Sequence, residues 1–205
     1  MNKYRITRDM FFSKVQARKL LTCCEALAKL ERDSGITTWR VRHILTHIAL
    51  HSGLRVSEIA NLCLGDVLLS TQENVLIVQR GKGGKRRDVY IDTGLANHIK
   101  KFIKHKKQWG HGTSAGDPLL RGRGGTPYTT TALYLAFKAV LREAGLPSRY
   151  SIHSCRHTYA TMLLAKTNNI RFVQKQLGHA SISMTAHYAD VLPEANQRLA
   201  ESLIK

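Results

Sequence analysis

The sequence predicts a mainly helical α+β fold with one small antiparallel β-hairpin. Apolar residues recur at helical spacing along most of the 205 residues. A single pair of short apolar runs, 75–78 and 87–91, flanks the glycine-rich turn Gly81–Lys85, which is typical of a hairpin. No linker rich in proline, glycine or serine divides the chain convincingly, so we expect one domain spanning residues 1–205.

The first half of the chain should contain four helices. Ser13 begins a capping-box pattern, so a helix is expected directly after it. A second helix should follow Thr37 and end near Gly53. Ser57 is a good N-cap for a short third helix, and Thr93 is expected to cap a fourth.

The second half should begin with a loop over 109–128, a stretch that holds six glycines and two prolines. A helix is expected over about 130–143, because its apolar residues keep helical spacing until Gly145. Shorter helices should follow at about 154–166, 170–177, 182–189 and 194–204.

The charge of the chain points to a polyanionic partner. Lys and Arg total 32 against 14 Asp and Glu, which gives a formal net charge of +18 at pH 7. Two clusters, within 80–87 and 98–111, concentrate this charge, so we expect a surface that binds the phosphates of double-stranded DNA. Such contacts give affinity rather than sequence preference. The residues predicted to bind DNA are Arg80, Lys85, Arg86, Arg87, Lys100, Lys101 and Lys104.

Several classes of protein are disfavoured. No apolar run approaches the roughly 18 residues of a membrane helix, and the N-terminus lacks the apolar core of a secretory signal. The four cysteines form no C-x-x-C pair and no compact Cys/His set with zinc spacing, so we expect reduced thiols and no metal site. These features favour a cytoplasmic protein without a membrane partner.

The sharpest local motif is H-x-x-R at His153 and Arg156. On a helix these two residues lie on one face about one turn apart, where an imidazole and a guanidinium can hold a phosphoryl group and move a proton. Arg55 stands at a predicted helix start, a favourable place for an anion, and Glu58 lies three residues further on, where it can hold that arginine. Each pattern taken alone also has an ordinary structural explanation.

Taken in order, these residues match a known signature. Arg55 in GLRVSE, Lys82 in RGKGGK and His153 and Arg156 in HSCRHTYAT are followed by His179 in LGH and Tyr188 in HYADV. The chain thereby resembles the catalytic domain of the tyrosine recombinase (phage integrase) family from about residue 13 onwards. Ile152 and Cys155 depart from the residues common in the family, and both substitutions leave the polar set intact.

The resemblance implies a site-specific recombinase that needs neither metal nor ATP. Tyr188 would attack a DNA phosphate and form a 3′-phosphotyrosyl bond, with Arg55 and Arg156 on the non-bridging oxygens. His153 would accept the tyrosine proton, His179 would bond the phosphate, and Lys82 would protonate the leaving 5′-hydroxyl.

The resemblance also carries expectations about assembly. The C-terminal helix, at about 194–204, would dock into a neighbouring protomer of a homotetramer on DNA, in a nucleoid-associated protein. Most members carry an N-terminal DNA-clamping domain that has no counterpart in this sequence. We therefore expect a single catalytic domain, either naturally short or excised.

Two other functions remain open at this point. The same chemistry could relax supercoils, as in a type IB topoisomerase. A basic DNA-binding protein could also retain the fold without catalysis. Formation of a covalent protein–DNA adduct separates the second alternative from both enzymes.

Overall fold

The computed structural model describes residues 6–31, 37–79, 81, 84–122 and 125–191. The first half holds a 3-10 turn at Arg8–Met10, the helices α1 (Lys14–Leu30), α2 (Thr38–Ser52) and α3 (Val56–Ala60), and a 3-10 turn at Leu64–Asp66. The strands β1 (Val67–Leu69), β2 (Asn74–Val78) and β3 (Arg87–Tyr90) follow. The remaining elements are α4 (Thr93–Gln108), α5 (Thr130–Glu143), α6 (Ile152–Thr167), α7 (Ile170–Leu177), α8 (Ser183–Ala186) and a 3-10 turn at Ala189–Val191.

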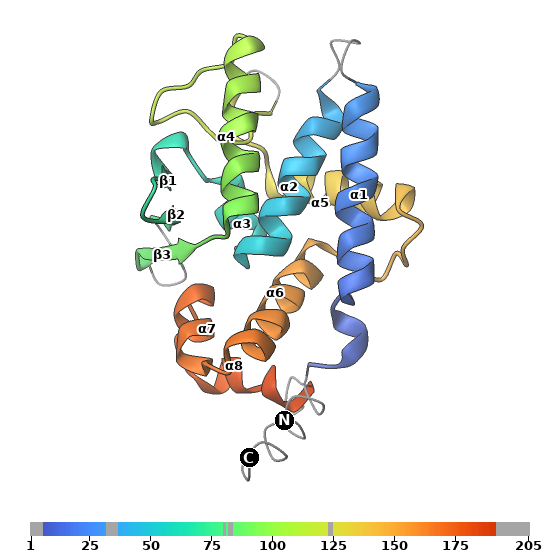
Figure 1. Cartoon of the computed structure of the whole chain (residues 1–205), viewed down its shortest axis with the longest axis vertical. Helices are drawn as coiled ribbons and strands as arrows, with labels where there is room; N and C mark the ends of the chain where they lie inside the picture. The colour runs from blue at the N-terminus through green and yellow to red at the C-terminus, as the bar shows by residue number, and fades with distance from the viewer. Residues whose placement is uncertain (1–5, 32–36, 80, 82–83, 123–124, 192–205) are drawn as a thin grey trace.

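Helix α2 lies at the centre of the fold. It contacts α1, α4, α5 and α6, and residues along most of its length are buried. Figure 1 shows α1, α2 and α4 standing side by side, with the sheet beside α4 and the α6–α8 segment at one end of these helices. The mainly helical α+β prediction is therefore confirmed.

The strands form a small antiparallel sheet. Among the described residues its order is β1-β2-β3, with Val67 opposite Leu76 and Val75 opposite Tyr90. The hairpin of β2 and β3 agrees with the sequence pattern, whereas β1 was not predicted. Strand β1 has only three residues and is half-buried at most, so it carries no alternating pattern long enough to recognise.

Two helix starts in the first half of the chain differ from the prediction. Helix α3 begins at Val56 rather than after Ser57, because Glu58 accepts the backbone N–H of Arg55 at 2.8 Å and makes Arg55 the N-cap. Helix α4 is capped by Asp92, whose carboxylate accepts the Leu95 N–H at 3.0 Å, and Thr93 is its first residue.

The C-terminal helices largely follow the prediction. Helix α6 starts at Ile152, two residues earlier than expected, because Ser151 caps it. The expected helix over 182–189 is divided into α8 and the turn Ala189–Val191. The predicted helix over 194–204 lies outside the described residues.

The buried apolar side chains of the described residues form two clusters. The main core includes Phe12, Leu45, Leu95 and Phe137, all 0–1% exposed, and it joins α1, α2, α4 and α5. A smaller cluster packs α6 against α7 and the end of the described chain; its buried members are Ile6, Phe11, Ala160, Leu164, Val173, Leu177 and Tyr188. Within the described residues, no helix is long and apolar enough to cross a membrane.

A row of histidines lies between α2 and α4. Nδ1 of His47 on α2 lies 2.9 Å from Nδ1 of His98 on α4, and the rings of His43 and His98 are centred 4.3 Å apart. Burial, more than any neighbouring charge, lowers the pKa of His43 and His47 to about 4 and that of His98 to about 3. These imidazoles are therefore neutral in the folded protein at pH 7.

This row predicts a loss of stability in mild acid. In the unfolded chain these histidines titrate near pH 6.5, so protonation favours unfolding as the pH falls from 6.5 towards 4. Each additional proton bound on unfolding should lower the free energy of unfolding by about 1.4 kcal/mol per pH unit. Urea unfolding of the wild type from pH 7 to pH 4.5 should show this slope. His98→Gln should reduce this slope by about 1.4 kcal/mol per pH unit, which is the contribution of one proton. A slope equal to that of the wild type would contradict the assignment.

Candidate active site

Arg156 is the most firmly held of the predicted catalytic residues. It lies on α6, is 3% exposed, and donates to the carbonyl oxygens of Gly53 at 2.6 Å and Leu177 at 2.7 Å. Burial, followed by the charge of Arg55, lowers its pKa to about 10, so the guanidinium stays charged at pH 7. These bonds tie α6 to the C-terminal ends of both α2 and α7.

Arg55 and Glu58 form the pair that the sequence suggested. Nη1 of Arg55 lies 2.9 Å from Oε1 of Glu58, and the Arg55 side chain is 24% exposed. Burial alone would raise the pKa of Glu58, but hydrogen bonds from Arg87 and the Arg55 backbone, with the charges of both arginines, hold it at about 2. The carboxylate is therefore ionised and fixes the direction of Arg55.

Arg87 does not occupy the position expected of a DNA contact. Its guanidinium makes a bidentate pair with Glu58, with Nη1–Oε1 and Nη2–Oε2 distances of 2.8 and 2.9 Å, and its Nε donates to the Gln176 carbonyl at 3.1 Å. The side chain is only 12% exposed. Arg87 thus links β3 to α3 and α7, and its charge is engaged inside the protein rather than at the surface.

His179 follows the turn that ends α7. Gly178 closes the helix with a φ of +63°, and a Cβ at this position would lie 2.8 Å from Cδ of Arg87. Nδ1 of His179 lies 2.9 Å from the Thr185 hydroxyl. Burial, followed by the charges of Arg156, Arg55 and Arg87, lowers the pKa of His179 to about 3. His179 therefore lies within the electrostatic reach of all three arginines.

Tyr188 lies between two imidazoles. Its hydroxyl is 3.0 Å from Nδ1 of His157, and its ring is nearly parallel to that of His179 at 6.3 Å between centroids. Its partner His157 directly follows Arg156 on α6, so the Tyr188 phenol lies beside the turn of α6 that carries Arg156. The residue is 3% exposed in this structure, so the hydroxyl faces the protein rather than solvent.

His153 lies at the first turn of α6. Its ring packs edge-on against His157, with centroids 4.5 Å apart. Desolvation by the surrounding protein, followed by the charges of Arg156 and Arg55, lowers the pKa of His153 below its ordinary value. The structure thus places His153 in contact with His157, a residue to which the sequence analysis assigned no role. Its position four residues after His153 was the available signal, because residues at this spacing share a helix face.

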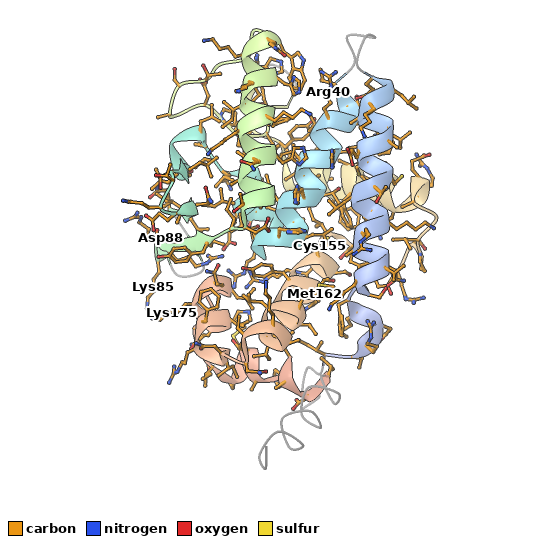
Figure 2. The ribbon with its side chains drawn as sticks, in the orientation of Figure 1. Arg40, Lys85, Asp88, Cys155, Met162 and Lys175 are labelled. Carbon is orange, nitrogen blue, oxygen red and sulfur yellow. The ribbon has the colours of Figure 1, made fainter. Side chains whose placement is uncertain are left out.

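The other residues predicted to bind DNA either lie at the surface or are not among the described residues. Lys85 and Arg86 are exposed beside the hairpin, and Figure 2 shows Lys85 on the same edge of the molecule as Lys175 of α7. Lys100, Lys101 and Lys104 are exposed along α4. Arg80 and Lys82 lie outside the described residues.

A cavity of about 660 Å³ lies away from these catalytic candidates, between α1, α2 and α4. His43, His98 and Lys101 are among its lining residues, and none of the five predicted catalytic residues that the structure describes is. Among the described residues, no group of three or more His, Cys, Asp or Glu side chains could hold a metal ion.

The inward position of Arg87 predicts a large difference between two adjacent arginines. Arg87→Ala removes two charged hydrogen bonds from a buried carboxylate and should lower the free energy of unfolding by about 3 kcal/mol. Arg86→Ala is the matched control, since Arg86 is exposed and pairs with Asp88 at 3.4 Å; its cost should stay below about 1 kcal/mol. Urea unfolding at pH 7 measures both, and equal costs would show that the Glu58 network does not stabilise the fold.

Curated proteins are similar to this chain in sequence. Tyrosine recombinase XerC of Listeria welshimeri is 32% identical over 178 residues, which cover 83% of this chain and 56% of the relative. Tyrosine recombinase XerA of Pyrococcus furiosus is 32% identical over 176 residues, covering 80% of this chain and 58% of the relative. The chain thus spans little more than half the length of these relatives.

Solved structures show the same architecture. The crystal structure of XerA recombinase superposes with a TM-score of 0.75 over 100% of this chain and 66% of that one, at 20% identity. XerH site-specific recombinase in a post-cleavage complex with its palindromic difH substrate gives 0.75 over 94% and 52%, at 26% identity. Residues 11–195 also match the Phage integrase family. The chain belongs to the phage integrase family of tyrosine recombinases.

Proposed function

We propose that this chain is the catalytic domain of a site-specific recombinase that cleaves and rejoins DNA through Tyr188. The observation that carries the proposal is that contacts connect Arg55, Arg156, His179 and Tyr188 from four separate parts of the chain. Glu58 joins Arg55 to Arg87, Arg87 and Arg156 bind backbone carbonyls at the end of α7, and the His179 ring after α7 is nearly parallel to that of Tyr188. The membership of the family and the DNA-bound state of XerH support the same reaction.

The two arginines supply the electrostatic part of the reaction. A DNA phosphodiester repels nucleophiles, and its pentacoordinate transition state carries additional negative charge. Arg156 is fixed by two backbone carbonyls, and its remaining N–H groups can donate to a non-bridging oxygen. Arg55, held by Glu58, would bind the other. Because both are positioned before DNA arrives, little reorganisation accompanies the reaction.

Tyr188 supplies the nucleophile. Its oxygen forms a bond to phosphorus as the bond from phosphorus to the 5′-oxygen breaks, which leaves a 3′-phosphotyrosyl link. Lys82 protonates the departing 5′-oxygen, and His179 donates to the phosphate. The covalent link conserves the energy of the phosphodiester bond. A 5′-hydroxyl of another strand can therefore attack the phosphotyrosyl link and rejoin the DNA without ATP.

The burial of Tyr188 sets a condition for this reaction. At 3% exposure, the side chain must shift before a phosphate can contact its oxygen. The residue stands between two short helical turns, α8 and Ala189–Val191, rather than within a long helix. A local change in this segment, driven by DNA binding, is therefore part of the proposed mechanism.

The remaining proposals concern the assembly. The exposed cations Lys85, Arg86, Lys100, Lys101 and Lys104 would bind the phosphates of double-stranded DNA. The segment 194–204 would couple protomers of a homotetramer on DNA, and residues 1–205 would act as one catalytic domain.

Tyr188→Phe should abolish covalent attachment to DNA while leaving DNA binding nearly unchanged. The substrate is a nicked duplex that carries the site this chain selects from a randomised DNA pool, and SDS-resistant adducts are counted on a gel. Tyr159→Phe is the matched control. Tyr159 is a neighbouring half-buried tyrosine whose hydroxyl lies 3.4 Å from the Gln176 side chain, and its loss should leave the adduct intact.

The same assay separates the alternatives. A wild-type protein that binds the duplex without forming an adduct would be a non-catalytic DNA-binding protein. An adduct accompanied by relaxation of a supercoiled plasmid, without strand exchange between two sites, would indicate a topoisomerase. An adduct that persists in Tyr188→Phe would assign the nucleophile to another residue.

Lys82→Ala should slow cleavage through loss of the acid that protonates the leaving group. A duplex with a bridging 5′-phosphorothiolate at the cleavage position should restore the rate, because a thiolate leaves without a proton. Lys85→Ala, in the same turn, should weaken binding and show no such sulfur-specific recovery. If sulfur has no effect on Lys82→Ala, the acid is a different group.

A further inference from the structure

His157 contacts the atom on which the proposed function rests. Its Nδ1 lies 3.0 Å from the Tyr188 hydroxyl oxygen, and the two residues are 6% and 3% exposed. This distance is that of a hydrogen bond formed before any DNA is present. His153, which the resemblance assigned as proton acceptor, instead packs its ring against that of His157.

The backbone holds His157 in this place. It directly follows Arg156 on α6, and Arg156 is fixed to the carbonyls of Gly53 and Leu177. The first turns of α6 therefore cannot rotate without breaking two charged hydrogen bonds. On the other side, Tyr188 belongs to the cluster that packs α6 against α7. Both partners of the contact are thus positioned by elements that also position the arginines.

The protonation state of His157 suits an acceptor. Burial, followed by the charges of His153 and Arg156, lowers its pKa to about 4, so the ring is neutral at pH 7. A neutral imidazole has one nitrogen without a proton. With the proton on Nε2, Nδ1 accepts a hydrogen bond from the Tyr188 hydroxyl. The titratable groups described around it are His153 and Arg156 on α6, His179 after α7, and Tyr188 itself.

We propose that His157 is the catalytic residue that accepts the Tyr188 proton when the hydroxyl attacks DNA. The inference rests on the proposed function, and it requires the shift that exposes Tyr188 to keep the phenol oxygen within hydrogen-bonding distance of Nδ1. The O–H bond of Tyr188 breaks and its proton passes to Nδ1 of His157. The Tyr188 oxygen bonds to phosphorus, and the 5′-oxygen leaves and takes its own proton from Lys82. The phosphate brings negative charge between Arg55 and Arg156, which offsets their charges and favours the imidazolium that forms.

This assignment leaves His153 on the phosphate side of the site. His153 is exposed in the first turn of α6, one turn before Arg156, where a DNA phosphate bound by that arginine could reach its ring. The two histidines of the H-x-x-R-H sequence would then divide the work: His153 would contact the phosphate and His157 the nucleophile.

His157→Asn tests proton transfer separately from positioning. The asparagine side chain can place a hydrogen-bond acceptor near the position of Nδ1, but an amide does not take up a proton at ordinary pH. Single-turnover adduct formation on the nicked duplex is measured from pH 6 to pH 9. His47→Asn is the matched control, because His47 is also a histidine of lowered pKa but lies between α2 and α4, away from Tyr188.

The wild type should show a nearly constant rate over this pH range. His157→Asn should be slower at pH 7 by on the order of 10²–10⁴-fold, and its rate should rise about tenfold per pH unit, as Tyr188 must ionise unaided. His47→Asn should follow the wild type. DNA binding in a gel-shift assay normalises every rate to folded protein, and His157→Ala should show the same pH dependence as His157→Asn.

Other results overturn the proposal. A wild-type rate in His157→Asn, or a loss by the same factor at every pH, would leave His157 only a positioning or structural role while the proposed function stands. Recovery of His157→Asn on the 5′-phosphorothiolate would place its action at the leaving group. Absence of an adduct with the wild type would instead contradict the proposed function.

Discussion

The geometry of the site depends on guanidinium groups held by fixed acceptors. Glu58, buried and ionised, binds Arg55 from its own turn and Arg87 from β3. Arg87 also donates a hydrogen bond to a backbone carbonyl of α7. Arg156 joins α6 to the same end of α7 and to the end of α2. An unpaired charge in such a place would be costly, and here each is matched by a carboxylate or a carbonyl. Because α3, β3, α6 and α7 meet through these bonds, the direction of Arg55 and the place of the His179 turn follow from them.

Local patterns allowed much of the fold to be predicted from the sequence. The Ser13 capping box, the glycine end of α2 and the limits of α5 and α7 depend on neighbours within a few residues, and the structure confirms them. The position of Arg87 was less evident, since it stands in a basic run. The one available signal was that Arg87 lies two residues before the apolar Val89 on β3, because residues two apart on a strand point to the same face. The contact between His157 and Tyr188 could not be predicted, because it is set by how the turn after α7 folds back on α6.

The described basic residues assigned to the site or to DNA binding fall into two physical groups. Arg55, Arg87 and Arg156 are engaged by protein acceptors in a partly buried site, where water screens their charge weakly. Lys85, Lys100 and Lys104 are exposed, so salt screens them strongly, and their attraction for a polyanion is unspecific and weakens as the ionic strength rises. Composition reveals the total of +18 but not this division. In the proposed function, the buried group would position the reacting phosphate and the exposed group would attract the DNA.

Tyr188 packs in the smaller apolar cluster rather than in the main core. Helix α6 spans both, with Cys155 in the main core and Leu164 in the smaller cluster. The proposed nucleophile could therefore become accessible through a local opening of the smaller cluster, without unfolding of the main core. In the proposed reaction, the timing of strand cleavage would then depend on the packing of a few aliphatic side chains such as Val173, and trimming them would change how often the phenol becomes available.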